Sequence, residues 1–99
     1  MAEVTLYIDI EELCENESIE QEIIVEVVEY GIATPQRGEI LSEWVFDLEN
    51  AYWIKKAVKL NQQLLLDWVA TSMVIDLMKE KEKLVQENDQ LRSRLSRLL

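Results

Sequence analysis

The feature that most constrains this chain is a repeat of leucine near its C-terminus. Leu77, Leu84, Leu91 and Leu98 are spaced by seven residues. An apolar residue at every seventh position keeps one stripe of an α-helix facing a partner helix, as position d does in a coiled coil. The stretch from Trp68 onward contains neither proline nor glycine and is rich in strong helix formers. The sequence therefore predicts one long helix that carries a coiled-coil seam.

The residues three before each leucine fall at position a of the same repeat, and two of these four, Lys81 and Asn88, are polar. Polar residues at position a are tolerated more readily in two-stranded coils than in larger bundles, so we expect a homodimer. The residues expected at the dimer contact are Val74, Leu77, Leu84, Asn88, Leu91, Leu95 and Leu98. An antiparallel pairing would set acidic residues opposite arginines, but both orientations stay open. The alternative is an amphipathic tail that packs on its own domain.

The net charge of the chain limits the classes of molecule that it can bind. The chain of 99 residues has 20 acidic and 10 basic residues, hence a net charge of −10, and no histidine. Such a surface repels nucleic-acid phosphates and anionic lipid and favours a basic protein partner. We expect no specific nucleic-acid binding and no membrane association. The single cysteine, Cys14, together with the lack of a signal peptide or a long apolar run, predicts a cytoplasmic location.

The first thirty residues predict a strand and two helices. Alternating apolar residues over Glu3 to Ile10 favour a half-buried strand. Asp9, with Glu12 three residues later, is expected to form a capping box that opens a short helix with Leu13 and Cys14 facing inward. Two helices joined by a short turn would make a helix-turn-helix unit.

Ser18 is expected to cap the second helix, from Ile19 to Tyr30, which Gly31 would end. Its predicted core face consists of Ile19, Ile23, Ile24, Val27, Val28 and Tyr30. Its predicted exposed face consists of Gln21, Glu22, Val25, Glu26 and Glu29. A helix that reads the major groove needs Arg, Lys, Asn or Gln on this face, so the carboxylates argue against DNA reading.

Residues 34–66 predict a small β-wing and a third helix. Thr34-Pro35 closes the first unit, residues 36–39 form a turn, and Ile40–Phe46 is expected to be a strand. Asp47 should cap a helix from Leu48 to about Leu66. Its expected inner stripe is Ala51, Ile54, Val58, Asn61 and Leu65, and its lysines, expected to form a solvated face, are Lys55, Lys56 and Lys59.

Asp67 should cap the long fourth helix. The predicted organisation is a helix-turn-helix domain over residues 1–66 and a dimerisation helix over residues 67–99.

Catalytic and cofactor chemistry has little support in this sequence. No histidine is available as a general base, one thiol cannot hold zinc, and Gly31 and Gly38 stand outside any phosphate-binding motif. Neighbouring carboxylates are expected by chance among 20 acidic residues. We therefore expect a protein that is not an enzyme and that holds neither a metal nor a cofactor.

Several short runs of residues resemble the chaperone modulatory protein CbpM family. They include VEYGIATP at residues 28–35, WVFD at 44–47, LDW at 66–68 and LRSRLSRL at 91–98. The similarity covers nearly the whole chain in register, with apolar Ile23 and Val25 as departures at positions expected to be polar.

This resemblance implies a mainly α, MerR-like winged helix-turn-helix with a small β-wing and a long C-terminal coiled-coil helix. It also implies binding to the basic helix in the J-domain of a CbpA-type co-chaperone of the DnaJ class, which would restrain that co-chaperone's action on Hsp70. The contact is then expected at Glu22, Val25, Glu26 and Glu29. The alternative is a MerR-like transcription regulator that binds DNA.

Overall fold

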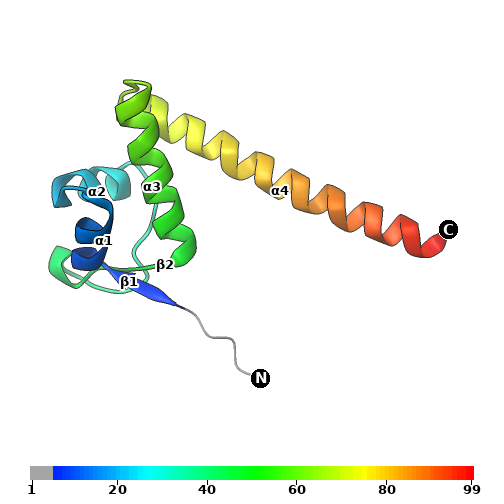
Figure 1. Cartoon of the computed structure of the whole chain (residues 1–99), viewed down its shortest axis with the longest axis horizontal. Helices are drawn as coiled ribbons and strands as arrows, with labels where there is room; N and C mark the ends of the chain where they lie inside the picture. Colours follow the sequence, from blue (N-terminus) through cyan, green and yellow to red (C-terminus); the bar gives the residue numbers. More distant parts are fainter. Residues whose placement is uncertain (1–5) are drawn as a thin grey trace.

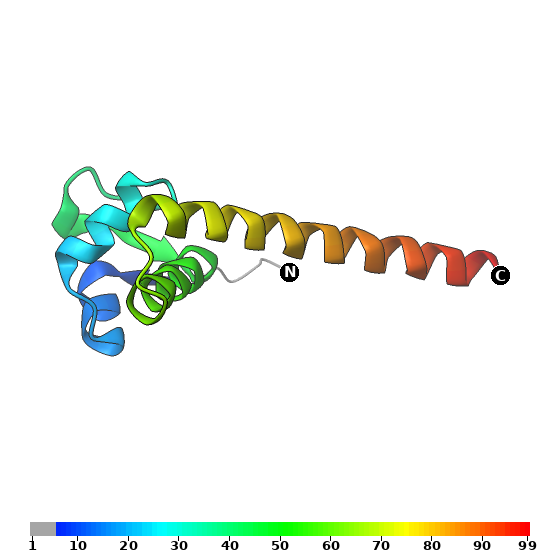
Figure 2. The ribbon, with the colours of Figure 1, turned by 90° about the horizontal axis from the view of Figure 1, so that it is seen from above.

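Four α-helices and a two-stranded sheet make up the described part of the computed structural model, residues 6–99 (Figure 1). Their order is β1 (Tyr7–Asp9), α1 (Ile10–Glu17), α2 (Gln21–Glu29), a 3₁₀ turn η1 (Leu41–Glu43), β2 (Val45–Asp47), α3 (Leu48–Gln63) and α4 (Trp68–Leu98). The elements up to α3 form a small body, and α4 extends from it as an arm (Figure 2). The predicted mainly α architecture with a long C-terminal helix is confirmed.

Aspartate side chains begin three of the four helices, as predicted. The carboxylates of Asp9, Asp47 and Asp67 each accept a hydrogen bond from the backbone N–H three residues later, at 2.8, 2.8 and 2.7 Å. Each of these bonds satisfies an amide that a helix leaves without an internal partner, and such a cap stabilises a helix by about 1 kcal/mol.

The turn between α1 and α2 differs from the prediction. Ser18 does not cap α2. It ends α1 in the left-handed conformation, with φ 54°, and its N–H donates to the carbonyl of Cys14. The N–H of Ile19 donates to the same carbonyl at 3.2 Å, and this turn brings the Ile19 side chain into the core. Helix α2 begins only at Gln21, and Glu20 before it makes no side-chain cap bond.

Helix α2 ends as predicted at Gly31, which has φ 73°. The N–H of Gly31 donates to the Val28 carbonyl at 3.0 Å and that of Ile32 to the Val27 carbonyl at 3.1 Å, which together form a Schellman motif. The prediction that Tyr30 faces the core is wrong, because the motif reverses the chain and buries Ile32 there instead, leaving Tyr30 45% exposed.

The wing is shorter than predicted. Only Val45 and Phe46 of the expected strand Ile40–Phe46 are extended; with Asp47 they form β2, which pairs antiparallel with Tyr7–Asp9. Residues 40–44 instead form the turn around η1, because Gly38, at φ 107°, lets the loop close on itself: an added Cβ would lie 2.5 Å from the Glu43 carbonyl oxygen. The first part of the other predicted strand, including Val4, lies outside the described residues.

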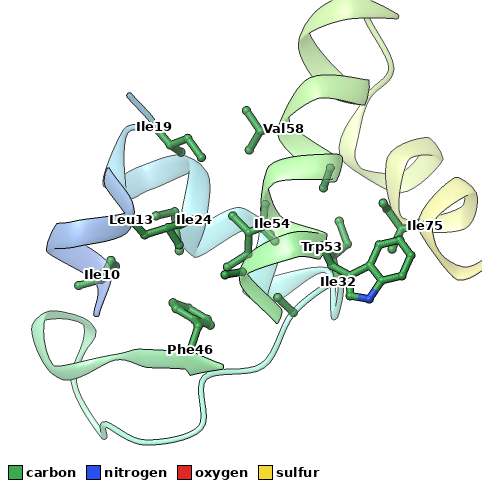
Figure 3. Close-up of a cluster of buried hydrophobic side chains, with 14 residues drawn as sticks. Ile10, Leu13, Ile19, Ile24, Ile32, Phe46, Trp53, Ile54, Val58 and Ile75 are labelled. Carbon is green, nitrogen blue, oxygen red and sulfur yellow. The ribbon is translucent and has the colours of Figure 1, made fainter. Parts of the chain in front are cut away.

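The core gathers buried residues from the other three helices, the loops and β2 around α3 (Figure 3). Ala51, Ile54 and Val58 are buried as predicted, and Trp53 and Ala57 join them. Leu65 was predicted to face inward but is 88% exposed. Helix α3 ends at Gln63, three residues earlier than expected. The Asn61 side chain, half-buried, donates to the Leu66 carbonyl at 2.7 Å across the turn that follows.

The first three turns of α4 pack against the body. Thr71 and Ile75 are fully buried, and Ile75 lies beside Trp53 in Figure 3. The Lys79 ammonium donates to the Ile32 carbonyl at 2.8 Å and lies 5.5 Å from the centre of the Trp53 ring. From Glu80 to Leu99 every residue is exposed. The arm therefore has one anchored end and one free end.

The hydroxyl of Thr71 is buried without a hydrogen-bond partner among the described residues. Burying such a group unpaired costs about 1–3 kcal/mol, so Thr71→Val, which keeps the shape, should raise the free energy of unfolding by up to about 1 kcal/mol. Ile75→Ala, one turn later, should lower it by about 2–5 kcal/mol. Urea unfolding followed by circular dichroism measures both variants. A clear loss of stability in Thr71→Val would mean that the hydroxyl is bonded.

Candidate protein-binding face

Helix α2 presents one buried and one acidic face. Ile24 and Val27 are fully buried against the body. Glu22, Glu26 and Glu29 are exposed, at spacings of four and three that place them on one side of the helix. Val25, predicted to be exposed among them, is half-buried. The outer surface of α2 is therefore a row of carboxylates with an apolar side chain partly covered beside it.

The structure adds carboxylates of α1 to this face. A shallow hollow of about 530 Å³ lies between α1, the start of α2 and η1, and its lining includes Glu11, Cys14 and Glu15. Burial raises the pKa of the Cys14 thiol, and the charges of Glu22 and Glu15 raise it further. The Cys14 thiol is thus affected by a carboxylate of each helix. Glu15 of α1 and Glu22 of α2 therefore both lie close enough to raise its pKa.

Positive charge is excluded from these two helices. The first basic residue of the chain is Arg37. The acidic residues of α1, α2 and the turn between them are Glu11, Glu12, Glu15, Glu17, Glu20, Glu22, Glu26 and Glu29. We call the outer surface of α1 and α2 that carries them the acidic face. It can attract a basic partner and carries no lysine or arginine that could bind phosphates.

Two of the three lysines on the predicted lysine face of α3 contact other residues of the chain. Lys55 forms an ion pair with Glu17 at 3.1 Å, which links α3 to the end of α1. Lys56 lies over the Tyr52 ring, 5.8 Å from its centre. Lys59 is exposed. The nearest lysine charge to the acidic face is therefore the Lys55 ammonium at its edge.

The predicted dimer residues remain uncovered in the single chain. Leu77, Leu84, Leu91, Leu95 and Leu98 are all more than half exposed, and Asn88 is exposed too, whereas Val74 is half-buried near the body. An exposed apolar stripe along a free helix is unusual for a monomer and is typical of an interaction surface.

Two further observations bear on function. Within residues 6–99 there is no group of three or more cysteine, histidine or acidic side chains placed to hold a metal ion. Over the same residues, no helix combines the length and the hydropathy that a membrane span requires.

Sequence reasoning missed Glu11 and Glu15 as part of the acidic face. Their spacing of four on a helix was visible in the sequence, but their position beside α2 depends on the turn at Ser18, which was predicted incorrectly. No sequence signal indicated the hollow beside Cys14, because its walls come from three separate elements.

Comparison with known proteins gives a consistent result. Residues 8–93 match the model of the family described as MerR HTH family regulatory protein. The chain is 37% identical over 90 residues to the chaperone modulatory protein CbpM of Pseudomonas entomophila, covering 91% of this chain and 88% of that protein. It is 36% identical over 99 residues to the protein of the same name from Citrobacter koseri, covering 100% and 97%.

The surroundings of Cys14 give a test of how α1 and α2 sit together. The raised pKa leaves little thiolate near neutral pH, so alkylation by iodoacetamide should be slow. Glu22→Gln and Glu15→Gln should each lower the pKa and speed alkylation about two- to threefold, because exposed charges contribute less than about 1 kcal/mol. Glu29→Gln, at the far end of α2, is the matched control. Equal rates in all variants would contradict this placement.

Proposed function

This chain belongs to the chaperone modulatory protein CbpM family of MerR-like helix-turn-helix proteins, and we propose that it binds the J-domain of a CbpA-type co-chaperone in the cytoplasm and inhibits its work with Hsp70. The observation that carries the proposal is the acidic face, where Glu22, Glu26 and Glu29 are exposed on the second helix of the helix-turn-helix.

The proposed mechanism is competition for a surface. J-domains of this class present a basic helix to Hsp70, and a row of carboxylates complements it in charge. Val25, half-buried beside the carboxylates, offers a small apolar contact at the centre of the row. A protein that covers the basic helix withholds it from Hsp70, and this requires no catalysis.

DNA binding is the second candidate, because the matching family is described as regulatory. In a helix-turn-helix the second helix enters the major groove. Here that helix is α2, and it carries carboxylates where phosphates and base edges need donors. The charge of this helix favours the protein partner over DNA.

We further propose that the chain is a homodimer through the exposed stripe of α4. Asn88 and all leucines of the stripe after Leu77 lie on the free part of the arm, where residues 6–99 supply no cover. The arm is 31 residues long, about 46 Å at about 1.5 Å per residue, and its free two-thirds give room for about three heptads.

Charge reversal on the acidic face should weaken the J-domain complex. Glu22→Lys combined with Glu26→Lys replaces attraction with repulsion at two neighbouring positions, and we expect an affinity loss of about tenfold or more, mainly through slower association. Calorimetric titration and stopped-flow binding with the purified J-domain measure both effects.

The matched control for this pair is Asp76→Lys with Asp89→Lys, which changes the net charge equally on exposed positions of α4. Affinity equal to that of the wild type in the Glu22/Glu26 variant, with an unchanged circular dichroism spectrum, would place the interface elsewhere. The contribution of Val25 to binding is tested with the uncharged variant Val25→Thr. A charged replacement is avoided, because a charge at this half-buried position would lower the stability of the fold.

DNA binding should be undetectable even at low ionic strength, where electrostatic attraction is strongest. Gel retardation of genomic fragments at about 20 mM salt is the measurement. Saturable retention of one fragment that a non-specific competitor fails to remove would favour the regulator.

The homodimer predicts a mass near twice 11.6 kDa in sedimentation equilibrium at micromolar concentration. Leu84→Lys with Leu91→Lys should shift the protein to a monomer with its body intact, since both side chains are exposed in the single chain. The control is Gln86→Lys with Ser93→Lys, on the side of the heptad away from the seam. A wild-type monomer at every concentration would exclude the dimer.

A further inference from the structure

A hollow of about 350 Å³ lies in the angle between α3 and the part of α4 that leaves the body (Figure 1). Tyr52, Trp53 and Lys56 of α3 line one side of it. The residues of α4 that line the other side are Met78, Lys81, Glu82, Val85 and Gln86. Pockets that bind small molecules begin at about 300 Å³, so this hollow has room for a ligand of one or two fused rings.

The α3 side of the hollow is aromatic. The rings of Tyr52 and Trp53 meet edge to face, with their centres 4.9 Å apart and their planes at 75°. Trp53 is buried, whereas Tyr52 is 45% exposed, and Val85 on the α4 side is 51% exposed. A flat apolar ligand can cover such exposed apolar surface inside a concave site, and this burial stabilises a complex.

Two lysines carry the positive charge of the hollow. The Lys56 ammonium lies 5.8 Å from the centre of the Tyr52 ring, and Lys81 stands on the α4 side. Within residues 6–99 neither lysine forms an ion pair, although the chain has 20 acidic residues and Glu82 also lines the hollow. The hollow therefore presents two ammonium groups and one carboxylate, in a chain whose net charge is −10.

These walls select one class of ligand. A cationic ligand on the Tyr52 ring would be repelled by the Lys56 ammonium, which already lies over that ring. A ligand without charge would leave Lys56 and Lys81 facing it without a counter-charge. An aromatic ring that carries one carboxylate meets both demands, because the ring covers the apolar walls and the carboxylate pairs with the lysines.

We propose that this hollow binds a small aromatic carboxylate. The ring packs between Tyr52 and Val85, and the carboxylate accepts hydrogen bonds from the ammonium groups of Lys56 and Lys81. The site is separate from the acidic face, because its walls belong to α3 and α4 while the acidic face belongs to α1 and α2. The ligand contacts both helices that set the direction of the arm, so its binding stabilises the folded chain.

The hollow lies beside the leucine stripe of α4 and is a different surface of that helix. None of the leucines of the stripe lines it, and Met78 and Val85 stand at heptad position e, next to the d leucines. A coiled-coil seam uses positions a and d, so it meets the hollow only along the edge formed by Lys81 and Val85.

Titration of the full chain with naphthoate tests the site, with the indole N–H signals followed in the NMR spectrum of the isotope-labelled protein. Trp53 lines the hollow, and the other two tryptophans, Trp44 and Trp68, do not. We expect a saturable shift of the Trp53 signal, which the variant Trp53→Phe identifies, while the other two signals stay in place. No saturable shift of the Trp53 signal would overturn the proposal.

Two analogues of the probe test the role of the carboxylate. Naphthamide keeps the rings and replaces the carboxylate with a neutral amide, and naphthylmethylamine replaces it with a cation. We expect both to bind at least about tenfold more weakly than naphthoate, because neither pairs with the lysines. Equal affinity for the amide and the carboxylate would reject an anion site.

Substitution of the lysines tests the two walls together. Each partly exposed charge contributes little by itself, so Lys56→Gln is combined with Lys81→Gln, and we expect naphthoate to bind about tenfold more weakly. The matched control is Lys59→Gln with Arg97→Gln, which removes the same charge from exposed positions of α3 and α4 outside the hollow. An equal loss in both double variants would mean that net charge and not the hollow attracts the probe, which would overturn the proposal.

A segment of a second copy is the other candidate occupant of the hollow. The Leu84→Lys with Leu91→Lys protein distinguishes the two, because neither leucine lines the hollow. We expect this variant and the wild type to bind naphthoate with the same affinity. Binding by the variant alone would mean that a second copy fills the hollow in the wild type, and this result would overturn the proposal.

Discussion

The packing of α4 on α3 sets the direction of the arm, and the proposed dimer contact along α4 depends on that direction. Ile75 and Thr71 are fully buried at this contact, and Trp53 is nearly so. The Lys79 ammonium ties the next turn to the Ile32 carbonyl, which belongs to the Schellman motif that ends α2. The geometry of α2 and that of the arm are thus linked through one short contact region.

The distribution of charge separates the two proposed roles. Residues 6–36 contain no lysine or arginine, so the charged side chains of α1 and α2 are all carboxylates. The basic residues are Arg37 and the lysines and arginines of α3 and α4. Of these, Lys55 of α3 forms an ion pair with Glu17 at the edge of the acidic face. A basic partner is therefore drawn to α1 and α2, while the leucine stripe remains available to a second copy.

The helix-turn-helix of this chain combines an apolar core with an acidic outer surface on its second helix. The core that positions α2 consists of Leu13, Ile24, Ile54 and Phe46, which would serve a DNA-binding protein equally well. The charged outward residues of α2 are carboxylates, whereas a helix that reads DNA needs hydrogen-bond donors there. The function proposed for this chain therefore rests on the outward residues of α2 and not on the fold.

The sequence by itself determined the features that rest on local chemistry. The aspartate caps, the glycine stop after α2, the buried stripe of Ala51, Ile54 and Val58, and the exposure of Glu22, Glu26 and Glu29 follow from hydrogen bonding and helical spacing within a few residues. Tertiary structure alone decided the position of Ser18, the exposure of Tyr30 and Leu65, the loop over residues 40–44 and the joining of Glu15 with Glu22. At Ser18 and Tyr30 the chain turns so that Ile19 and Ile32 reach the core, and the free energy of burying these side chains exceeds the local preference.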